Sequence, residues 1–296
     1  MPATFSHIAI IFNPESTGNA PALAKKLAKD LKKRGYASRL EPTKRVGHAI
    51  EIAKRISLKH ERPLVISVSG DGGYNEVING VMAAKMESKK ANPVVSVLGA
   101  GNANDHYRVM HDEPIIDLIA KNSVQPMDLI SISVTAPQFS LERYAHSYIG
   151  FGITPEIGDE LNRHSKDIFS EIVLVIKSFM KFRPFTISHK GVKRVCDSLL
   201  FANINEMAKF VSLDDKNTTH DNLFTMIEFG HRGKTALLLT LLKAATLGLR
   251  NRPSYREYSF TVLDELAVQC DGEIDTLRAG AKVTIKSRPH AIDSLH

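Results

Sequence analysis

The chain has 296 residues, of which 43% are hydrophobic and 24% are charged, as is typical of a folded soluble protein. Its 39 basic and 32 acidic residues give a net charge of +7, which favours anionic partners such as nucleotides, nucleic acid or an anionic membrane surface. Only two cysteines, no signal-peptide pattern and no apolar run near ~18 residues exclude a disulfide framework, secretion and a membrane span, so we expect a cytoplasmic protein.

Strands and helices alternate over the first 125 residues. Apolar runs that end at turn residues predict strands, and apolar residues at helical spacing, such as Leu23, Leu27 and Leu31, predict helices. In chain order the predicted elements are a strand from His7, a helix over 20–35, a strand over 37–43, a helix over 47–60, a strand over 64–69, a helix over 74–86 and a strand over 93–101. This alternation indicates a parallel sheet covered by helices, so we predict a Rossmann-like α/β domain over residues 1–125.

The pattern changes after Pro126. The predicted strands cover residues 128–136, 143–153, 192–204, 224–229 and 257–263, and two predicted helices cover residues 156–182 and 232–249. We therefore expect a second, mostly antiparallel β domain over residues 126–288, with the boundary near residues 122–127. The last residues, 289–296, are expected to pack back on the first domain. The leucine-rich segment 232–252 is interpreted as a core helix, with docking on anionic lipid as the alternative.

Three turns follow strands of the predicted parallel sheet, at residues 13–18, 69–73 and 99–105. Ligands of such sheets bind beyond the carboxyl ends of the strands, so the three turns together form a candidate site. The glycines of SGDGG (69–73) permit positive φ and close backbone approach, and the N–H groups of such a turn can hold phosphate. Asp71 then fits a divalent cation that binds both carboxylate and phosphate. The alternative is that Asp71 caps the following helix.

A second group of acids lies near the end of the chain, where Asp271, Glu273 and Asp275 alternate and would share one face of a strand. Such acids are either solvated in an exposed turn or include a general base for a hydroxyl that attacks phosphate. Other patterns give less evidence of a functional site. The glycines of GHRGKT (230–235) are too close together for a Walker A motif, and the histidines show no zinc-ligand pattern. The basic and aromatic segment 177–194 is interpreted as a solvated face, and we expect no nucleic-acid partner.

These segments, in this order, resemble those of the diacylglycerol kinase catalytic-domain family, which includes bacterial soluble lipid kinases, sphingosine kinases and ceramide kinases. The most specific segment is SGDGGYNEVING (69–80), which is similar to the family signature GGDGTxNEVxNG. The segments FNPESTG (12–18), TKRVGHA (43–49), GAGNANDHYR (99–108), YIGFGITPEI (148–157), HDNLFT (220–225) and CDGE (270–273) are similar to NPxSG, TxxxGHA, GTGNDFAR, GxGxDAxV, DDGxLD and DGE.

The resemblance implies an α/β nucleotide-binding domain joined to a β-sandwich domain, with the active site in the cleft between them. It also implies that the γ-phosphate of ATP is transferred to a lipid hydroxyl, as in diacylglycerol or sphingosine. Glu273 matches the general base, Asp71 acts through Mg²⁺, and Asp221 matches a ligand of a second, structural Mg²⁺. Together with the strand-end turns, the expected nucleotide-site residues are Asn13, Pro14, Ser16, Thr17, Gly18, Thr43, Ser69, Gly70, Gly72, Gly73, Asn75, Glu76, Gly101, Asn102, Asn104 and Asp105.

The sequence departs from the family pattern at several positions. Gly73 and Asn102 replace threonines, Thr154 replaces an aspartate, and Asn222 and Thr225 change the second metal segment. Because Asp71 and Glu273 are retained, we expect an active kinase that meets its lipid at a membrane surface as a peripheral protein. The alternatives are a non-catalytic protein of the same fold that binds nucleotide or lipid, and a kinase of a soluble, NAD-like substrate. The sequence leaves open whether the protein forms a homodimer.

Overall fold

The computed structural model describes residues 5–16, 18–101, 104–110, 113–137, 139–152, 183–204, 206–207, 211–212, 220–231, 233 and 252–296. The chain divides into two compact units, one formed by Met1–Leu129 with Pro289–His296 and the other by Ile130–Arg288. The helices expected over 156–182 and 232–249, and most of the leucine-rich segment, lie outside the described residues. Within the described ranges, no helix is both long and apolar enough to cross a membrane.

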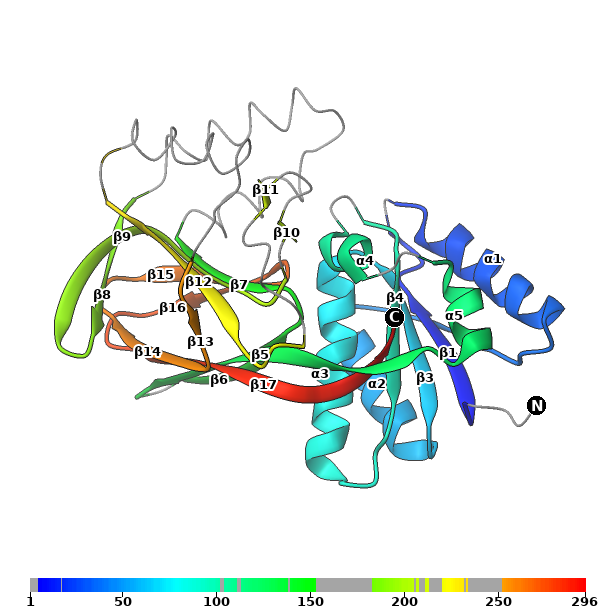
Figure 1. The fold of residues 1–296 in the computed structure, drawn as a ribbon. Helices are drawn as coiled ribbons and strands as arrows, with labels where there is room; N and C mark the ends of the chain where they lie inside the picture. The colour runs from blue at the N-terminus through cyan, green and yellow to red at the C-terminus, as the bar shows by residue number, and fades with distance from the viewer. Residues whose placement is uncertain are drawn as a thin grey trace. The chain divides into compact units, whose positions relative to one another are not determined.

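The first unit is built on a parallel sheet with the strand order β4-β3-β1-β2. Its elements are β1 (His7–Phe12), α1 (Ala20–Lys33), β2 (Arg39–Pro42), α2 (His48–Lys59), β3 (Pro63–Ser69), α3 (Asp71–Glu87), β4 (Val94–Gly99), α4 (Asp105–Met110) and α5 (Ile115–Lys121). Figure 1 shows α1 and α5 on one face of this sheet and α2 and α3 on the other. The predicted α/β unit is therefore confirmed.

Apolar side chains explain this layering. Alternate residues of β1, such as Ile8 and Ile10, pack in one core cluster with Leu27 and Leu31 of α1, because successive side chains of a strand point to opposite faces. On the other face α2 and α3 pack very closely. A methyl group at Gly80 of α3 would lie 2.4 Å from the Ile50 carbonyl oxygen and 2.8 Å from Ala53 Cβ, so glycine permits this helix contact.

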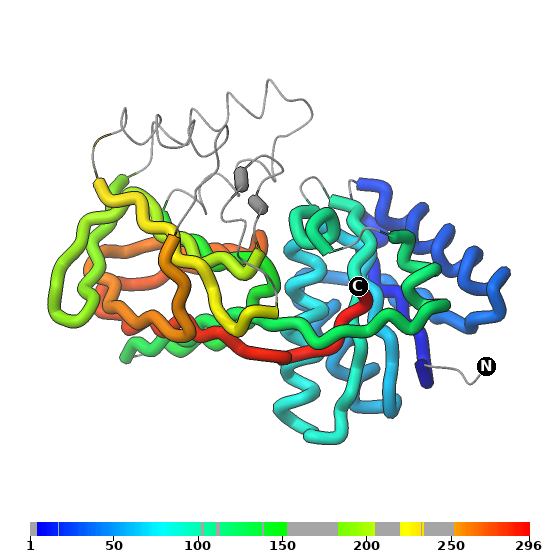
Figure 2. Tube along the Cα trace, viewed as in Figure 1, coloured from blue at the N-terminus to red at the C-terminus, as the bar shows by residue number. Residues whose placement is uncertain are grey.

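The last strand of the chain, β17 (Lys282–Leu295), ends beside β4 in the first unit. Asp293 and Ser294 lie opposite Val94 and Val95 in a parallel pairing, and Figure 2 follows this segment to the C-terminus. A side chain of α3 also binds this segment, since Lys85 Nζ donates to the backbone carbonyl oxygen of Ala291 at 2.6 Å. Burial lowers the pKa of Lys85, and the nearby Asp293 carboxylate opposes that shift.

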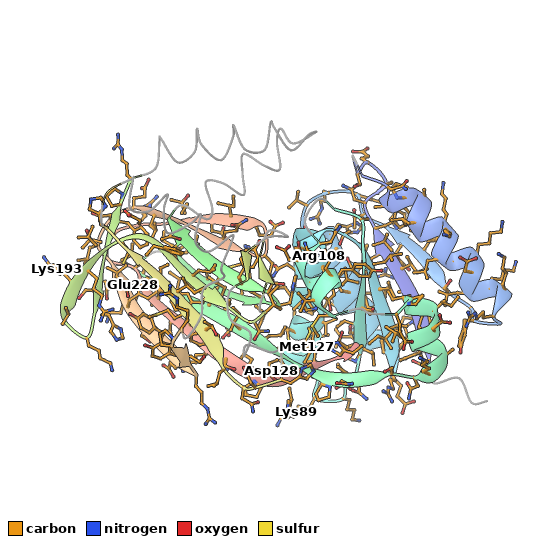
Figure 3. The ribbon with its side chains drawn as sticks, turned by 45° about the horizontal axis from the view of Figure 1, so that its top comes forward. Lys89, Arg108, Met127, Asp128, Lys193 and Glu228 are labelled. Carbon is orange, nitrogen blue, oxygen red and sulfur yellow. The ribbon has the colours of Figure 1, made fainter. Side chains whose placement is uncertain are left out.

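A buried carboxylate holds the other end of this segment. Asp128, labelled in Figure 3 beside Met127, is fully buried on β5 (Val124–Ala136), and its Oδ1 accepts a hydrogen bond from His290 N at 2.8 Å. β5 begins within the boundary region that the sequence predicts, residues 122–127, and continues beyond it. The change in texture near these residues therefore marks the start of a long strand.

The second unit is built from antiparallel strands around one apolar core. Its strands are β6 (Phe139–Ala145), β7 (Tyr148–Gly152), β8 (Phe185–His189), β9 (Val192–Ala202), β10 (Glu206–Met207), β11 (Val211–Ser212), β12 (Phe224–Gly230), β13 (Ser254–Tyr255), β14 (Glu257–Val262), β15 (Leu266–Cys270) and β16 (Glu273–Leu277), with parts of β5 and β17. Phe151, Phe201 and Phe260 meet at the centre, with ring centroids 5.3–6.3 Å apart. The expected antiparallel β unit is confirmed.

Candidate nucleotide and catalytic sites

The turns after β1, β3 and β4 meet at the carboxyl edge of the parallel sheet. Ala100 N donates to the Ser69 carbonyl oxygen at 2.9 Å. A methyl group at Gly101 would lie 2.6 Å from Gly70 Cα, and one at Gly18 would lie 2.5 Å from the Ala100 carbonyl oxygen. Only glycine fits at such distances, so the lack of a side chain at these positions lets the three turns approach one another. The strand order thus gathers the turns that the sequence singles out.

The glycine turn after β3 is part of a helix, which corrects the predicted start of that helix at residue 74. α3 begins at Asp71, and Gly70 is its N-cap residue with φ −85°. Gly72 and Gly73 are helical and lack the positive φ that the sequence suggested, and a Cβ at Gly73 would lie 2.6 Å from Ser69 Cβ. The first N–H groups of a helix have no partner within it, and such groups bind phosphate well. The start of α3 therefore has the properties of a phosphate site.

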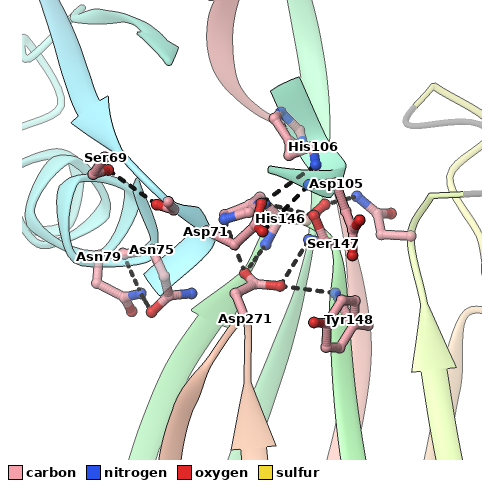
Figure 4. Close-up of polar contacts among 12 residues, drawn as sticks. Ser69, Asp71, Asn75, Asn79, Asp105, His106, His146, Ser147, Tyr148 and Asp271 are labelled. Atoms are coloured by element: carbon pink, nitrogen blue, oxygen red, sulfur yellow. Dashed lines mark hydrogen bonds and ion pairs between the residues drawn. The ribbon is translucent and has the colours of Figure 1, made fainter. Parts of the chain in front are cut away.

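The Asp71 carboxylate binds the start of α4 rather than the start of α3, the helix to which Asp71 belongs. Its two carboxylate oxygens accept hydrogen bonds from Asp105 N and His106 N at the start of α4, each at 3.3 Å, and Gly70 makes no side-chain cap on α3 (Figure 4). Hydrogen bonds of this length are weak, and a carboxylate offers about four acceptor positions. The same oxygens therefore fit the role of an Mg²⁺ ligand, because Mg²⁺ in phosphate sites is held by one or two carboxylates.

The turn after β4 is held by Asn104, a residue in the left-handed conformation with φ 52°. Its Oδ1 accepts from Gly101 N at 2.8 Å and its Nδ2 donates to the Gly101 carbonyl oxygen at 2.7 Å. Asp105 is fully buried and lies 3.4 Å from Arg108 Nη1. Asn104 and Asp105, which are both predicted site residues, therefore shape the turn. Asn102 is also a predicted site residue, and it lies outside the described residues.

Glu76 and Asn75 of α3 are also engaged in the scaffold. Glu76 Oε1 accepts from Gly47 N at 2.8 Å and its Oε2 accepts from Ala49 N at 3.1 Å. The side chain thus satisfies donors at the start of α2, where the N-cap residue is Gly47. Asn75 is buried, and its Oδ1 accepts from Asn79 Nδ2 at 3.0 Å. For Glu76 the geometry supports a capping role.

The turn after β1 is stabilised by its own side chains. Asn13 Oδ1 accepts from Glu15 N at 2.9 Å, and Ser16 Oγ accepts from Gly18 N at 3.3 Å. Thr43 joins the turn from the end of β2, since its N–H donates to the Phe12 carbonyl oxygen at 2.9 Å. The remaining predicted residues of this turn are Pro14, which is exposed, and Thr17, which lies outside the described residues.

In the second unit, Asp271 forms a buried anion-binding arrangement that the sequence did not predict. Its carboxylate accepts hydrogen bonds from three successive backbone N–H groups, of His146 at 2.7 Å, Ser147 at 3.0 Å and Tyr148 at 2.8 Å (Figure 4). His146 Nε2 lies 3.3 Å from the same carboxylate, and His146 and Asp271 are both fully buried. The expectation that Asp271 is a solvated acid is therefore wrong.

Asp271 and Gly272 form the two-residue turn between β15 and β16, with φ 47° and 98°. An Asp-Gly pair between two strands is a strong hairpin signal, which would have placed Asp271 in a turn rather than on the face of a strand. Glu273 follows as the first residue of β16 and is half-buried. The predicted face of three acids thus contains Glu273 and Asp275, which lies 2.8 Å from Arg143 Nη1.

The expected second metal site rests on Asp221, which is half-buried just before β12. Its Oδ1 accepts from Leu223 N at 2.9 Å, and Asn222 is left-handed with φ 62°, so the segment is a tight turn. Among the residues that the structure describes, no group of three or more His, Cys, Asp or Glu side chains is placed to hold a metal ion. Thr154, the departure expected to bear on the lipid, lies outside the described residues.

Comparison with known proteins agrees with the resemblance of the sequence segments. Residues 7–132 match the family model of the diacylglycerol kinase catalytic domain. The likeness to the diacylglycerol kinase catalytic domain thus covers most of the first unit. A protein named diacylglycerol kinase from Bacillus subtilis is 24% identical to it, over 96% of this chain and 95% of the relative. Another of that name, from Staphylococcus epidermidis, is 28% identical over 74% of this chain and 68% of the relative.

Solved structures are also similar to this chain in fold. A crystal structure of a diacylglycerol kinase from Bacillus anthracis str. Sterne superposes with a TM-score of 0.71 at 16% identity, over 100% of this chain and 98% of that one. The likeness covers the chain beyond the residues that the family model matches. The resemblance inferred from the sequence segments is thus confirmed, and it supports a phosphotransferase of the kinase type.

Proposed function

We propose that this protein is a lipid kinase that transfers the γ-phosphate of ATP, in the presence of Mg²⁺, to a lipid hydroxyl of the diacylglycerol or sphingosine type. The observation that supports it most is the meeting of three backbone turns at Gly18, Gly70 and Gly101 beside the start of α3 and the Asp71 carboxylate. Backbone N–H groups without bulky side chains suit a polyphosphate, and an adjacent carboxylate suits its cation.

In this proposal the first unit binds and orients the nucleotide. N–H groups at the start of α3 donate to phosphate oxygens, and the Gly70 and Gly101 contact lets the phosphate approach the backbone closely. Asp71 would hold the Mg²⁺, which neutralises charge on the phosphates when it is bound. Positioning and charge neutralisation provide most of the acceleration in phosphoryl transfer, so the backbone itself is the main catalytic device of this unit.

Glu273 is the proposed general base. Its carboxylate takes the proton of the acceptor hydroxyl while the hydroxyl oxygen forms a bond to the γ-phosphorus. The bond from that phosphorus to the β,γ-bridging oxygen breaks at the same time, and ADP leaves. The Asp271 turn supports this role because it immobilises the start of β16, where Glu273 lies.

The lipid class is inferred from the relatives and from charge. The relatives that match over most of the chain are named diacylglycerol kinases. A net charge of +7 favours contact with anionic lipid surfaces, where such an acceptor is found. We therefore propose that the protein acts on its substrate at a membrane surface.

The test is phosphoryl transfer from γ-labelled ATP with Mg²⁺ and a total lipid extract, with the wild type beside Glu273→Gln. We expect label in the organic phase for the wild type and a loss of about 10²- to 10⁴-fold for Glu273→Gln, at an unchanged unfolding midpoint. Asp275→Asn is the matched control, since Asp275 follows Glu273 on the same face of β16 and pairs with Arg143. Nucleotide binding without labelled lipid would favour a non-catalytic binding protein, and a labelled water-soluble product would favour a kinase of a soluble substrate.

A further inference from the structure

The hairpin of β8 and β9 ends in a tip, residues 190–195, that the rest of the described chain does not cover. Lys190 and Gly191 form its turn, and β12 on the other side of β9 ends opposite Cys196. A strand that is covered on one face alternates between buried and exposed residues. Residues 192–195 are instead exposed in succession, whereas residues 196–202 are buried in succession (Figure 1). Both faces of the tip are therefore accessible.

The hairpin tip combines apolar and basic side chains. Val192 is 59% exposed and Val195 is 48% exposed, although valine is one of the residues most often buried. Lys190 and Lys193 are exposed beside them, and residues 188–195 include no acid. The sequence interpretation of this basic segment as a solvated face accounts for the lysines and leaves the valines unexplained.

The strands that carry the tip are held firmly at its base. The His189 ring stacks on Tyr258 with centroids 4.3 Å apart, and its Nδ1 lies 2.7 Å from the Ser259 carbonyl oxygen. Across the sheet, Arg194 Nη1 donates to Glu228 Oε2 at 2.8 Å. A tip that is ordered before it meets a partner loses little conformational entropy on binding.

The same contacts leave the charge of the tip on its two lysines. Glu228 compensates Arg194, but neither Lys190 nor Lys193 has an ion pair among the residues that the structure describes. Figure 3 labels Lys193 at the hairpin and Glu228 on the neighbouring strand. Exposed apolar side chains next to uncompensated positive charge fit a partner that is both apolar and anionic.

We propose that the hairpin tip docks on an anionic membrane surface. Val192 and Val195 contact the boundary between headgroups and acyl chains, and Lys190 and Lys193 lie among the lipid phosphates. Nucleic acid offers phosphates without an apolar layer for the valines, and a second copy of the tip would repel the first. This inference rests on the proposed function and deepens it, because it names the surface through which the protein meets its lipid.

The charge contribution is tested by sedimentation with vesicles of phosphatidylcholine that contain about 30 mol% phosphatidylglycerol, without ATP or acceptor. Lys193→Glu should weaken vesicle binding about fivefold or more, as expected for one basic side chain near an anionic surface. Lys89→Glu is the matched control, because it makes the same change of net charge at an exposed lysine of the first unit, and its binding should stay within about twofold of the wild type.

The apolar contribution is tested with a second pair of variants. Val192→Ser should weaken binding about three- to tenfold, since it removes apolar surface that the membrane would bury. Val46→Ser is its control, because Val46 of the first unit is 81% exposed and lies outside the tip. Thermal unfolding midpoints check that each variant is folded.

Equal weakening by Lys193→Glu and Lys89→Glu would show that net charge alone attracts the protein and would overturn the proposal. Binding of a single-stranded RNA that Lys193→Glu abolishes, with no vesicle binding, would assign the tip to nucleic acid instead. Vesicle binding by a protein that phosphorylates no lipid would refute the proposed function and leave the docking surface standing. Phosphorylation of detergent-dispersed lipid without vesicle binding would do the reverse.

Discussion

The two Asp-Gly turns of this protein look alike in sequence and differ in structure. In the turn after β3, Asp71 begins a helix, and its carboxylate accepts two hydrogen bonds of 3.3 Å from the start of another helix. In the turn between β15 and β16, Asp271 is left-handed and fully buried, and its carboxylate accepts three hydrogen bonds of 2.7–3.0 Å. The element that follows decides the difference, because a helix continues from the first and a strand from the second.

This difference suggests a division of labour. The long bonds of Asp71 suit a carboxylate that shares its oxygens with a cation, whereas the short bonds of Asp271 suit one that holds a fold. The backbone around the two turns differs as well. The first turn has no room for an added atom at Gly101 or Gly73, whereas the second depends on the carboxylate of Asp271. The following predictions run from the largest expected effect on stability to the smallest.

Asp271→Ala should cause the largest loss of stability, about 3–5 kcal/mol in the free energy of unfolding of the second unit. The change leaves the backbone N–H groups of residues 146–148 without their carboxylate acceptor, together with a buried histidine. Urea unfolding followed by circular dichroism measures it. Asp275→Ala is the control and should stay within about 1 kcal/mol, since its ion pair with Arg143 is partly exposed. Equal losses in the two variants would remove the contrast between the turns.

Gly101→Ala tests whether the first turn is sensitive to an added atom, as the second turn is to a removed one. The new methyl group would lie 2.6 Å from Gly70 Cα, so the two turns must separate, at a cost of about 1–3 kcal/mol. Binding of Mg·ATP should weaken more than tenfold in equilibrium dialysis. Gly230→Ala is the matched control, because no atom lies within 4 Å of its added Cβ. Unchanged nucleotide affinity in Gly101→Ala would separate the meeting of the turns from phosphate binding.

Asp71→Ala should cost less stability than Asp271→Ala, because the two hydrogen bonds that its carboxylate accepts from α4 are 3.3 Å long. Its main effect should be on the cation, so the Mg²⁺ concentration for half-maximal phosphoryl transfer should rise more than tenfold. A titration of activity with Mg²⁺ measures it, with thermal unfolding as the check on folding. A stability loss as large as that of Asp271→Ala would show that Asp71 is a structural carboxylate.

Cys196 supplies a buried titratable group that lacks the N–H donors of Asp271. Burial, and then the nearby Glu228 carboxylate, raise the pKa of its thiol from 9.0 to about 12. The folded protein therefore keeps a proton that the unfolded chain loses, so this contribution to stability falls as pH rises from about 9 to about 12. Between pH 8 and pH 9 the loss should be about 0.4 kcal/mol, and it should be absent in Cys196→Ala. An identical pH dependence in the two proteins would contradict this assignment.

Sequence patterns predicted the layers of the fold better than its details. Buried strands such as β3 are continuous apolar runs, and α1 has leucines at helical spacing, so both could be recognised locally. The start of α3 could not be recognised in this way, because Gly72 and Gly73 are poor helix formers. Residues 289–296 were expected to return to the first unit, but the pairing of the end of β17 with β4, about two hundred residues earlier in the chain, is a tertiary contact that no local pattern indicates.

The candidate site shows the same limit. The strand-end turns and their glycines could be found, because ligands bind at that edge of a parallel sheet. The partners of the polar side chains could not. Glu76 caps α2, Asp71 holds α4, and Asp271 binds a backbone segment far away in the sequence, and each of these depends on tertiary contacts. Polar residues of a motif therefore included scaffold residues that sequence alone could not separate from ligand-binding ones.

The most direct test of the proposed kinase activity is the balance of products in one reaction. Wild-type protein is incubated with γ-labelled ATP, Mg²⁺ and mixed micelles that carry diacylglycerol or sphingosine, and ADP and organic-phase label are counted together. We predict equal amounts of ADP and labelled lipid for one of the two acceptors, and neither product above background for Glu273→Gln. ADP formed without labelled lipid, or label that remains in the aqueous phase with both acceptors, would contradict the account.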